Sequence, residues 1–246
     1  MCRLLGVLAN DTRDFGLCLQ RAPRSLAALS TEHPDGWGVA VWEPKAGWRL
    51  RKRPACAQGD VSFVELAEQT RGHVLIAHVR QRTVGPAILE NTHPFRSGRW
   101  IFAHNGTIDD VEYLRAQISG TRRTHIRGST DSELLFAFLL TRLDSAGIGE
   151  EPSNDATDLV VAQVVDELGR RPSLGSYNFV LCDGETLYAQ RRGRSLFVLE
   201  RTEAGGHTIA LVASEAVTDE PWRSLGEGSL VRCRRTDPMR WHALRY

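Results

Sequence analysis

The chain opens with Met1-Cys2-Arg3-Leu4-Leu5-Gly6, in which a cysteine directly follows the initiator methionine. Removal of Met1 would leave a chain that begins with Cys2 and carries a thiol and a free α-amine on adjacent carbons. A free α-amine titrates at about 7.7–8.0 and a free thiol at about 8.5. The amine is therefore suited to act as the local base for its own side-chain nucleophile. The alternative is that Cys2 is an ordinary buried residue of the first strand.

The composition of the chain is that of an ordinary globular protein. It has 246 residues, of which 41% are hydrophobic and 25% charged, so we expect a single domain over residues 1–246 with a substantial core. The net charge of +1 creates no global field that would attract nucleic acid or an anionic membrane. No run reaches the roughly 18 apolar residues of a membrane span, and no secretory signal is apparent. Five cysteines without a CxxC pair predict reduced thiols and a cytoplasmic location.

Apolar runs and turn residues predict an α+β domain that is rich in strands. Strands are expected at residues 2–9, 39–43, 48–53, 73–79, 100–103, 177–182, 187–190, 196–200, 208–213 and 229–233. Helices are expected at residues 62–69, 109–118, 132–143 and 159–168, the first of them with Ser62 as N-cap. A polar loop is expected at 82–98 and a surface loop at 152–157.

Polar residues with chemical potential follow two of the predicted strands. The segment His78-Val79-Arg80-Gln81-Arg82-Thr83 ends a buried strand, where Arg80 is placed to clamp a carboxylate with two hydrogen bonds, unless it is simply exposed. Ala103-His104-Asn105-Gly106 closes the next strand, where the Asn105 amide and the Gly106 N–H are suited to an oxyanion hole. The same Asn-Gly pair is also a common tight turn, so both interpretations stay open.

Three further segments are rich in residues found at functional sites. In Gly128-Ser129-Thr130-Asp131-Ser132-Glu133, Ser129 or Thr130 is a candidate N-cap for the following helix. Asp131 in the same segment is a candidate partner for a substrate ammonium. Asn91-Thr92-His93-Pro94-Phe95 and Asp35-Gly36-Trp37-Gly38 are both turn-like.

Taken together and in this order, these motifs resemble the class II glutamine amidotransferases, which belong to the N-terminal nucleophile hydrolase superfamily. The resemblance covers roughly residues 2–135 and rests on the N-terminal cysteine, DGWG, the strand ending in His-x-Arg, NTHPF, HNG and STDSE. It is closest to the stand-alone YafJ-like group, which lacks a fused synthase domain. It implies a four-layer αββα sandwich of two mainly antiparallel sheets, with residues 176–246 as the second half.

The resemblance also implies the chemistry. Cys2 would be the nucleophile, its amine the base, and Asn105 with Gly106 the oxyanion hole. The thiolate would attack the side-chain amide of glutamine or of a γ-glutamyl compound, release ammonia or an amine, and leave a thioester that water hydrolyses.

The remaining implied roles concern binding. Arg80 would hold the substrate α-carboxylate with help from Thr83, Asp131 would hold the α-ammonium, and His93 would organise its loop. The partner is a small-molecule substrate, no cofactor is expected, and the sequence contains no P-loop or dinucleotide fingerprint. Any released ammonia would go to solvent or to a separate synthase subunit.

Three other interpretations stay beside this one. The chain also resembles the γ-glutamyl hydrolase of ergothioneine biosynthesis, through Thr83-Val84-Gly85 after the arginine strand. A non-catalytic glutamine-binding subunit requires that Met1 be retained. A metal hydrolase is disfavoured, because no HExxH or comparable ligand spacing occurs. Its candidate ligands would be His73, His78, His93 and His104.

Overall fold

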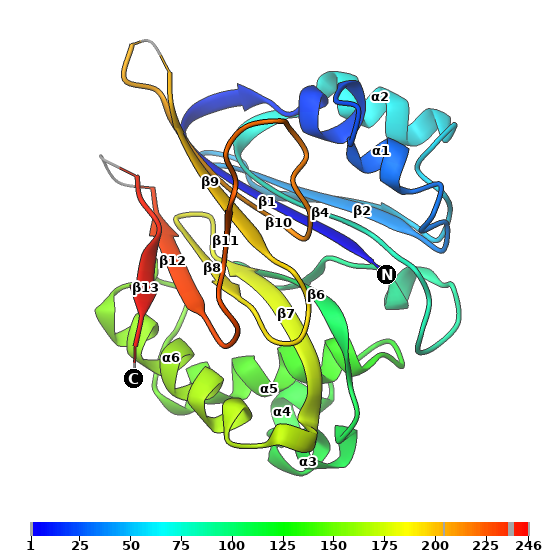
Figure 1. Cartoon of the computed structure of the whole chain (residues 1–246). Helices are drawn as coiled ribbons and strands as arrows, with labels where there is room; N and C mark the ends of the chain where they lie inside the picture. Colours follow the sequence, from blue (N-terminus) through cyan, green and yellow to red (C-terminus); the bar gives the residue numbers. More distant parts are fainter. Residues whose placement is uncertain (1, 204, 236–238, 246) are drawn as a thin grey trace.

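The computed structural model describes residues 2–203, 205–235 and 239–245 of the chain. Two antiparallel sheets face one another, and helices cover the outer face of each (Figure 1). This is the four-layer αββα sandwich that the family resemblance implies. Among the described residues, no helix combines the length and the apolar character needed to span a membrane.

The first sheet has seven strands, and the N-terminal strand β1 lies near its middle. The strand order is β11-β9-β10-β1-β4-β2-β3. The strands are β1 (Arg3–Asp14), β2 (Trp37–Glu43), β3 (Gly47–Arg53), β4 (Arg71–Val79), β9 (Phe197–Thr202), β10 (Thr208–Ala213) and β11 (Arg223–Ser224). β1 pairs with β4 on one side, Leu5 opposite Ala77, and with β10 on the other, Leu5 opposite Ala213.

The second sheet has six strands in the order β13-β12-β8-β7-β6-β5. They are β5 (Phe95–Ser97), β6 (Trp100–Ile108), β7 (Gly175–Cys182), β8 (Thr186–Gln190), β12 (Leu230–Arg234) and β13 (His242–Leu244). The helices are α1 (Leu26–Leu29), α2 (Val61–Gln69), α3 (Val111–Gln117), α4 (Gly120–Arg123), α5 (Asp131–Ser145) and α6 (Asp155–Gly169), with short 3₁₀ turns at Leu89–Asn91 and Pro172–Leu174 and a π turn at Leu17–Arg21.

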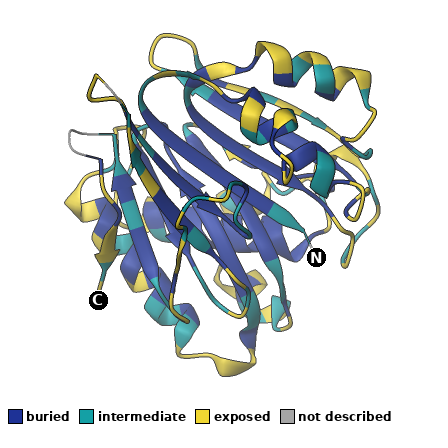
Figure 2. Cartoon of the chain, turned by 45° about the horizontal axis from the view of Figure 1, so that its top comes forward, coloured by how far each residue is buried: buried dark blue, intermediate teal, exposed yellow. Residues whose placement is uncertain are grey.

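Successive side chains of a strand point to opposite faces of its sheet, which divides the core into layers. In β1, Leu4 and Leu8 pack between the sheets against residues such as Ile101, whereas Leu5 and Val7 pack toward α1 and α2. A third cluster fills the space between the six-stranded sheet and the helices α5 and α6. Figure 2 shows the result: the strands are buried along most of their length, and exposed residues gather on the outer helices and loops. Both faces of both sheets are therefore covered over much of their area.

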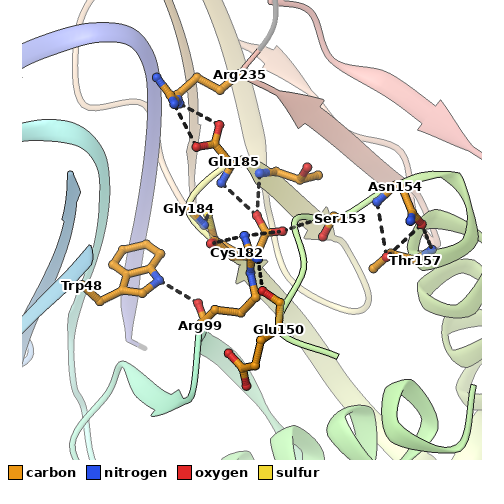
Figure 3. A network of polar contacts seen from close by, with 12 residues as sticks. Trp48, Arg99, Glu150, Ser153, Asn154, Thr157, Cys182, Gly184, Glu185 and Arg235 are labelled. Carbon is orange, nitrogen blue, oxygen red and sulfur yellow. Dashed lines mark hydrogen bonds and ion pairs between the residues drawn. The ribbon is translucent and has the colours of Figure 1, made fainter. Parts of the chain in front are cut away.

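A polar network also ties the two sheets together at the β7–β8 turn (Figure 3). Trp48 of β3 donates its indole N–H to the Arg99 carbonyl at 2.7 Å, and Arg99 Nη2 donates to the Asp183 carbonyl at 3.2 Å. The Asp183 carboxylate accepts the backbone N–H of Glu185 at 2.9 Å, and Arg235 in turn pairs with the Glu185 carboxylate at 2.8 Å. Cys182 pairs with Leu187 across this turn, so β7 and β8 form a hairpin.

Three local predictions are wrong at their boundaries. The N-cap of α2 is Asp60, whose carboxylate accepts the N–H of Ser62, so Ser62 is not the cap. The loop predicted at 152–157 ends early, because Asn154 and Thr157 form a capping box that starts α6 at Asp155. The loop predicted at 82–98 contains a 3₁₀ turn and the short strand β5.

Candidate active site

The residues that the sequence singles out converge from four parts of the chain. Cys2 directly precedes β1, Arg80 directly follows β4, Asn105 and Gly106 lie on β6, and Asp131 opens α5. A cavity of about 20 Å³ brings most of them together. Those that line it are Cys2, Arg80, Thr83, His93, Gly106 and Asp131.

Cys2 is held by contacts to two other segments. The Asn105 amide donates to the Cys2 carbonyl at 2.9 Å. The backbone N–H of Gln81 lies 3.2 Å from Cys2 Sγ, and Sγ lies 3.2 Å from the Gln81 carbonyl oxygen. Burial raises the pKa of the Cys2 thiol, while the Gln81 N–H and the positive charge of Arg80 oppose that rise. A nearby base is therefore needed to form the thiolate at neutral pH.

The Asn105-Gly106 pair is not a turn, which settles the alternative that the sequence left open. Both residues continue β6, with Asn105 opposite Asn178 of β7. A Cβ atom on Gly106 would lie 2.0 Å from the Ser176 carbonyl oxygen, so only glycine fits this position. The Asn105 amide thus reaches from the six-stranded sheet to the first residue before the seven-stranded sheet's central strand.

Arg80 is 3% exposed, so the interpretation as a surface arginine is wrong. Its guanidinium donates to the carbonyls of Val84 at 2.6 Å, Gly85 at 3.3 Å and Pro86 at 2.9 Å. These bonds fold the segment after β4 back over the cavity. Within the described residues Nε makes no hydrogen bond, which leaves a donor for a further acceptor.

Asp131 is buried, and one of its two carboxylate oxygens already accepts a hydrogen bond. Its Oδ2 accepts the backbone N–H of Ile108 at 2.7 Å, which fastens the start of α5 to the end of β6. Oδ1 accepts no hydrogen bond from the described residues. The N-cap of α5 is Thr130, whose hydroxyl accepts the Glu133 N–H at 3.2 Å. Asp131 therefore stands in the first helical turn with one carboxylate oxygen available.

Two buried histidines, His93 and His104, line the cavity, and a third, His78, lies against His93. His93 stacks on His78 at a ring-centroid distance of 4.3 Å, and neither ring nitrogen of His93 has a hydrogen-bond partner among the described residues. His104 lies within hydrogen-bond distance of Ser132 Oγ, at 2.8 Å from Nδ1. Burial lowers the pKa of all three rings, that of His93 well below its ordinary value and that of His78 to about 3. All three are consequently neutral at pH 7.

Three further findings bear on the chemistry. Thr83 lines the cavity, but its side chain is exposed and makes no hydrogen bond with the described residues. In residues 2–203, 205–235 and 239–245, no group of three or more His, Cys, Asp or Glu side chains is arranged to hold a metal ion. A larger cavity of about 550 Å³ lies between β3, β5 and α5, and Cys2 is not among its lining residues. The larger cavity is thus separate from the candidate nucleophile.

The buried histidines predict a loss of stability in acid. The pKa of His78 is about 3 in the folded chain and about 6.5 when unfolded. Between these values the unfolded chain binds more protons, so the free energy of unfolding falls as the pH drops below about 6.5. At pH 5 the loss from His78 alone is about 2 kcal/mol. Urea unfolding at pH 7 and at pH 5 measures this loss. Between the two pH values, we expect the free energy of unfolding of His78→Leu to fall by about 2 kcal/mol less than that of the unmodified chain. An identical loss in the two proteins would contradict this assignment.

The two facing antiparallel sheets, with a cysteine before the central strand of one and an Asn-Gly pair on the other, are arranged as in the N-terminal nucleophile hydrolase fold. The model of the family described as glutamine amidotransferases class-II matches residues 1–207. The chain belongs to this family, and it is an enzyme of the class II glutamine amidotransferase type.

Similar proteins support this assignment along most of the chain. YafJ of Escherichia coli (strain K12), which carries the name of a glutamine amidotransferase, is 30% identical over 85% of this chain and 80% of its own length. The gamma-glutamyl-hercynylcysteine sulfoxide hydrolase of Mycobacterium tuberculosis (strain H37Rv) is also 30% identical, over 94% of this chain and 92% of its own.

Solved structures agree with the fold. A protein from Pseudomonas aeruginosa PA01, titled a predicted glutamine amidotransferase, superposes with a TM-score of 0.62 at 26% identity, covering 94% of this chain and 96% of that one. A glutamine aminotransferase class-II domain protein from Silicibacter pomeroyi reaches a TM-score of 0.66 at 20% identity, covering 99% of this chain and 100% of that one.

Proposed function

We propose that the chain, after removal of Met1, hydrolyses the side-chain amide of glutamine or of a γ-glutamyl compound with Cys2 as the nucleophile. The observation that carries this proposal is the 2.9 Å bond from the Asn105 amide to the Cys2 carbonyl. It supports the proposal because an amide N–H donor lies beside the residue that bears the thiol. The raised pKa of that thiol supports a role for the adjacent α-amine as base.

The proposed reaction has two halves. The α-amine takes the Cys2 thiol proton, and the sulfur attacks the amide carbonyl to form a C–S bond and an oxyanion, which the Asn105 amide and the Gly106 N–H stabilise. The C–N bond then breaks, the amine returns the proton to the leaving ammonia or amine, and a γ-glutamyl thioester remains. A water molecule, deprotonated by the same amine, displaces the thiol and releases glutamate.

The head of the substrate meets two opposite charges in this proposal. Arg80 binds the α-carboxylate through the guanidinium N–H groups that are not bonded to the loop carbonyls. Asp131 binds the α-ammonium through Oδ1. Thr83 assists at the carboxylate, and His93, which is neutral and stacked on His78, organises its loop without transferring protons. Both charged groups are nine-tenths buried or more, which strengthens each contact with the substrate.

Two kinds of substrate suit this site equally well, because glutamine and a γ-glutamyl thiol conjugate carry the same α-carboxylate and α-ammonium groups. The similarity to gamma-glutamyl-hercynylcysteine sulfoxide hydrolase over nearly the full length of both chains supports the second. A comparison of ammonia released from glutamine with amine released from γ-glutamyl conjugates separates them. We propose that released ammonia passes to solvent or to a separate synthase subunit. The five free cysteines support a reducing compartment such as the cytoplasm.

Intact mass before and after incubation with diazo-oxo-norleucine, a glutamine-derived electrophile, tests the proposal. We expect a chain without Met1 that gains one adduct, located on Cys2 by peptide mapping. Retention of Met1 with no adduct would favour the non-catalytic glutamine-binding subunit. An adduct on Cys18 or Cys56 would refute Cys2 as the nucleophile.

Replacement of the oxyanion donor has a defined expected effect. Asn105→Ala should lower kcat by about 10²–10³-fold, because one donor to the developing negative charge is lost. The adduct with diazo-oxo-norleucine should still locate to Cys2, although more slowly. Asn10→Ala is the control, since Asn10 bonds to Thr208 and Gly206 and lies outside the residues of the site. Equal kcat values for Asn105→Ala and the unmodified chain would remove Asn105 from the mechanism.

A further inference from the structure

We propose that Asn91 is a positioning residue that fixes the spacing between Arg80 and Asp131, the two groups that hold the substrate head. This inference rests on the proposed function and deepens it. Arg80 and Asp131 belong to segments 51 residues apart in the chain, yet both must contact substituents of a single α-carbon. The side chain of Asn91 joins the two segments directly.

On the Arg80 side, the contact runs through one shared carbonyl. Asn91 Nδ2 donates to the Pro86 carbonyl at 3.0 Å. The same oxygen accepts Arg80 Nη1 at 2.9 Å. The amide and the guanidinium therefore hold the same point of the loop, and a shift of one displaces the acceptor of the other.

On the Asp131 side, Asn91 is hydrogen-bonded to Ser129, the residue before the N-cap of α5. Its Oδ1 accepts the Ser129 N–H at 2.8 Å, and its Nδ2 lies 3.2 Å from Ser129 Oγ. Ser129 is followed by Thr130, the N-cap of α5, and then by Asp131 as the first helical residue. The position of Ser129 thus helps to fix the start of α5 and with it the position of the Asp131 carboxylate.

The surroundings of Asn91 leave it little freedom. The side chain is 0% exposed, and two glycines approach it from opposite segments. A Cβ on Gly85 would lie 2.8 Å from Asn91 Nδ2, and a Cβ on Gly128 would lie 2.3 Å from Asn91 Oδ1. Gly85 also has a φ of +71°, which disfavours other residues. The Asn91 amide fits in this position because neither Gly85 nor Gly128 has a side chain.

An amide is the group that this junction requires. It accepts from a backbone N–H on one segment and donates to a backbone carbonyl on the other, which neither an aspartate nor an aliphatic side chain does. Misplacement of a binding group by about 1 Å costs about 10²-fold in rate. Loss of the Asn91 amide should therefore weaken recognition of the complete head while the reactivity of the Cys2 thiol stays unchanged.

Two reagents separate these effects. Diazo-oxo-norleucine carries the α-carboxylate and α-ammonium, whereas iodoacetamide carries neither, and both label a reactive thiol. We expect Asn91→Ala to lower the second-order rate of Cys2 labelling by diazo-oxo-norleucine about 10²-fold and to leave labelling by iodoacetamide within about twofold. Asn91→Asp, which keeps the acceptor for Ser129 but loses the donor to Pro86, should behave like the alanine variant and covers the case in which that variant does not fold.

Thr92→Val is the matched control, because Thr92 is equally buried, adjacent, and bonds only to Ile88 through its hydroxyl. It should leave both labelling rates unchanged. In an Arg80→Gln background, Asn91→Ala should add little, since residues that act as one unit are not additive. Equal slowing by both reagents, full additivity, or the same effect from Thr92→Val would overturn the inference. If the unmodified chain is not labelled at Cys2 by diazo-oxo-norleucine, the proposed function itself fails, a result that differs from all of these.

Discussion

Cys2→Ala should lower amide hydrolysis by at least about 10⁴-fold, the scale on which hydrolases lose activity when the nucleophile is removed. In the proposed reaction the Cys2 thiol forms the thioester, and no other described cysteine lines the cavity. Ammonia release from glutamine, or amine release from a γ-glutamyl conjugate, measures the loss. Circular dichroism should show an unchanged fold, because Cys2 is only partly buried and precedes β1.

Two companion variants separate the thiol from the amine. Cys18→Ala should keep full activity, since burial raises the pKa of that thiol to about 11 and it lies outside the site. An alanine inserted between Met1 and Cys2 keeps the thiol but acylates the α-amine. It should slow hydrolysis by about 10²–10⁴-fold, the contribution of a positioned general base. Full activity in the inserted chain would show that the base is another group.

Arg80→Gln should lower kcat/KM by about 10³-fold. Loss of a buried, charge-assisted contact costs about 2–5 kcal/mol, and here the same side chain also anchors the loop through three carbonyls. Arg80→Lys should not restore activity, because one ammonium cannot replace a planar fork that serves several acceptors. Initial rates over a range of substrate concentrations separate the effects on KM and kcat.

Arg82→Gln is the matched control for this change. Arg82 lies two residues away and is exposed, and its backbone N–H, not its side chain, bonds to Asp35 at 2.8 Å. Its kcat/KM should stay within about twofold of the unmodified chain, as for most surface substitutions. A similar loss at Arg82 and Arg80 would show that the effect is one of general charge and not of the buried contact.

Much of the fold and of the site could be predicted from the sequence, because strand alternation and motif order are local properties. The resemblance carried by the ordered motifs from Cys2 through Asp131 predicted residues most of which the structure brings together. Local pattern could not decide whether Asn105-Gly106 was a turn or a strand. That depended on pairing with β7, which lies some 70 residues further on.

Other features of the site had no local signal at all. The N–H and carbonyl of Gln81 that flank Cys2 Sγ belong to the backbone, which every residue type supplies. The link from His104 to Ser132 joins two segments whose neighbourhood exists only in the folded sandwich. Asn91 stood within a turn-like motif, but its partners Pro86 and Ser129 became visible only in three dimensions.

The division of the site between two sheets has a consequence for the newly made protein. Cys2 leads into a strand that is flanked by β4 and β10, so its surroundings are complete only when residues beyond 208 have been synthesised and paired. The proposed oxyanion donors, Asn105 and Gly106, belong to β6 of the other sheet. Under the proposed function, a nascent chain that has lost Met1 would carry the Cys2 thiol long before the surrounding site residues are in place. The proposed activity would then require the completed fold, with both sheets paired and facing one another.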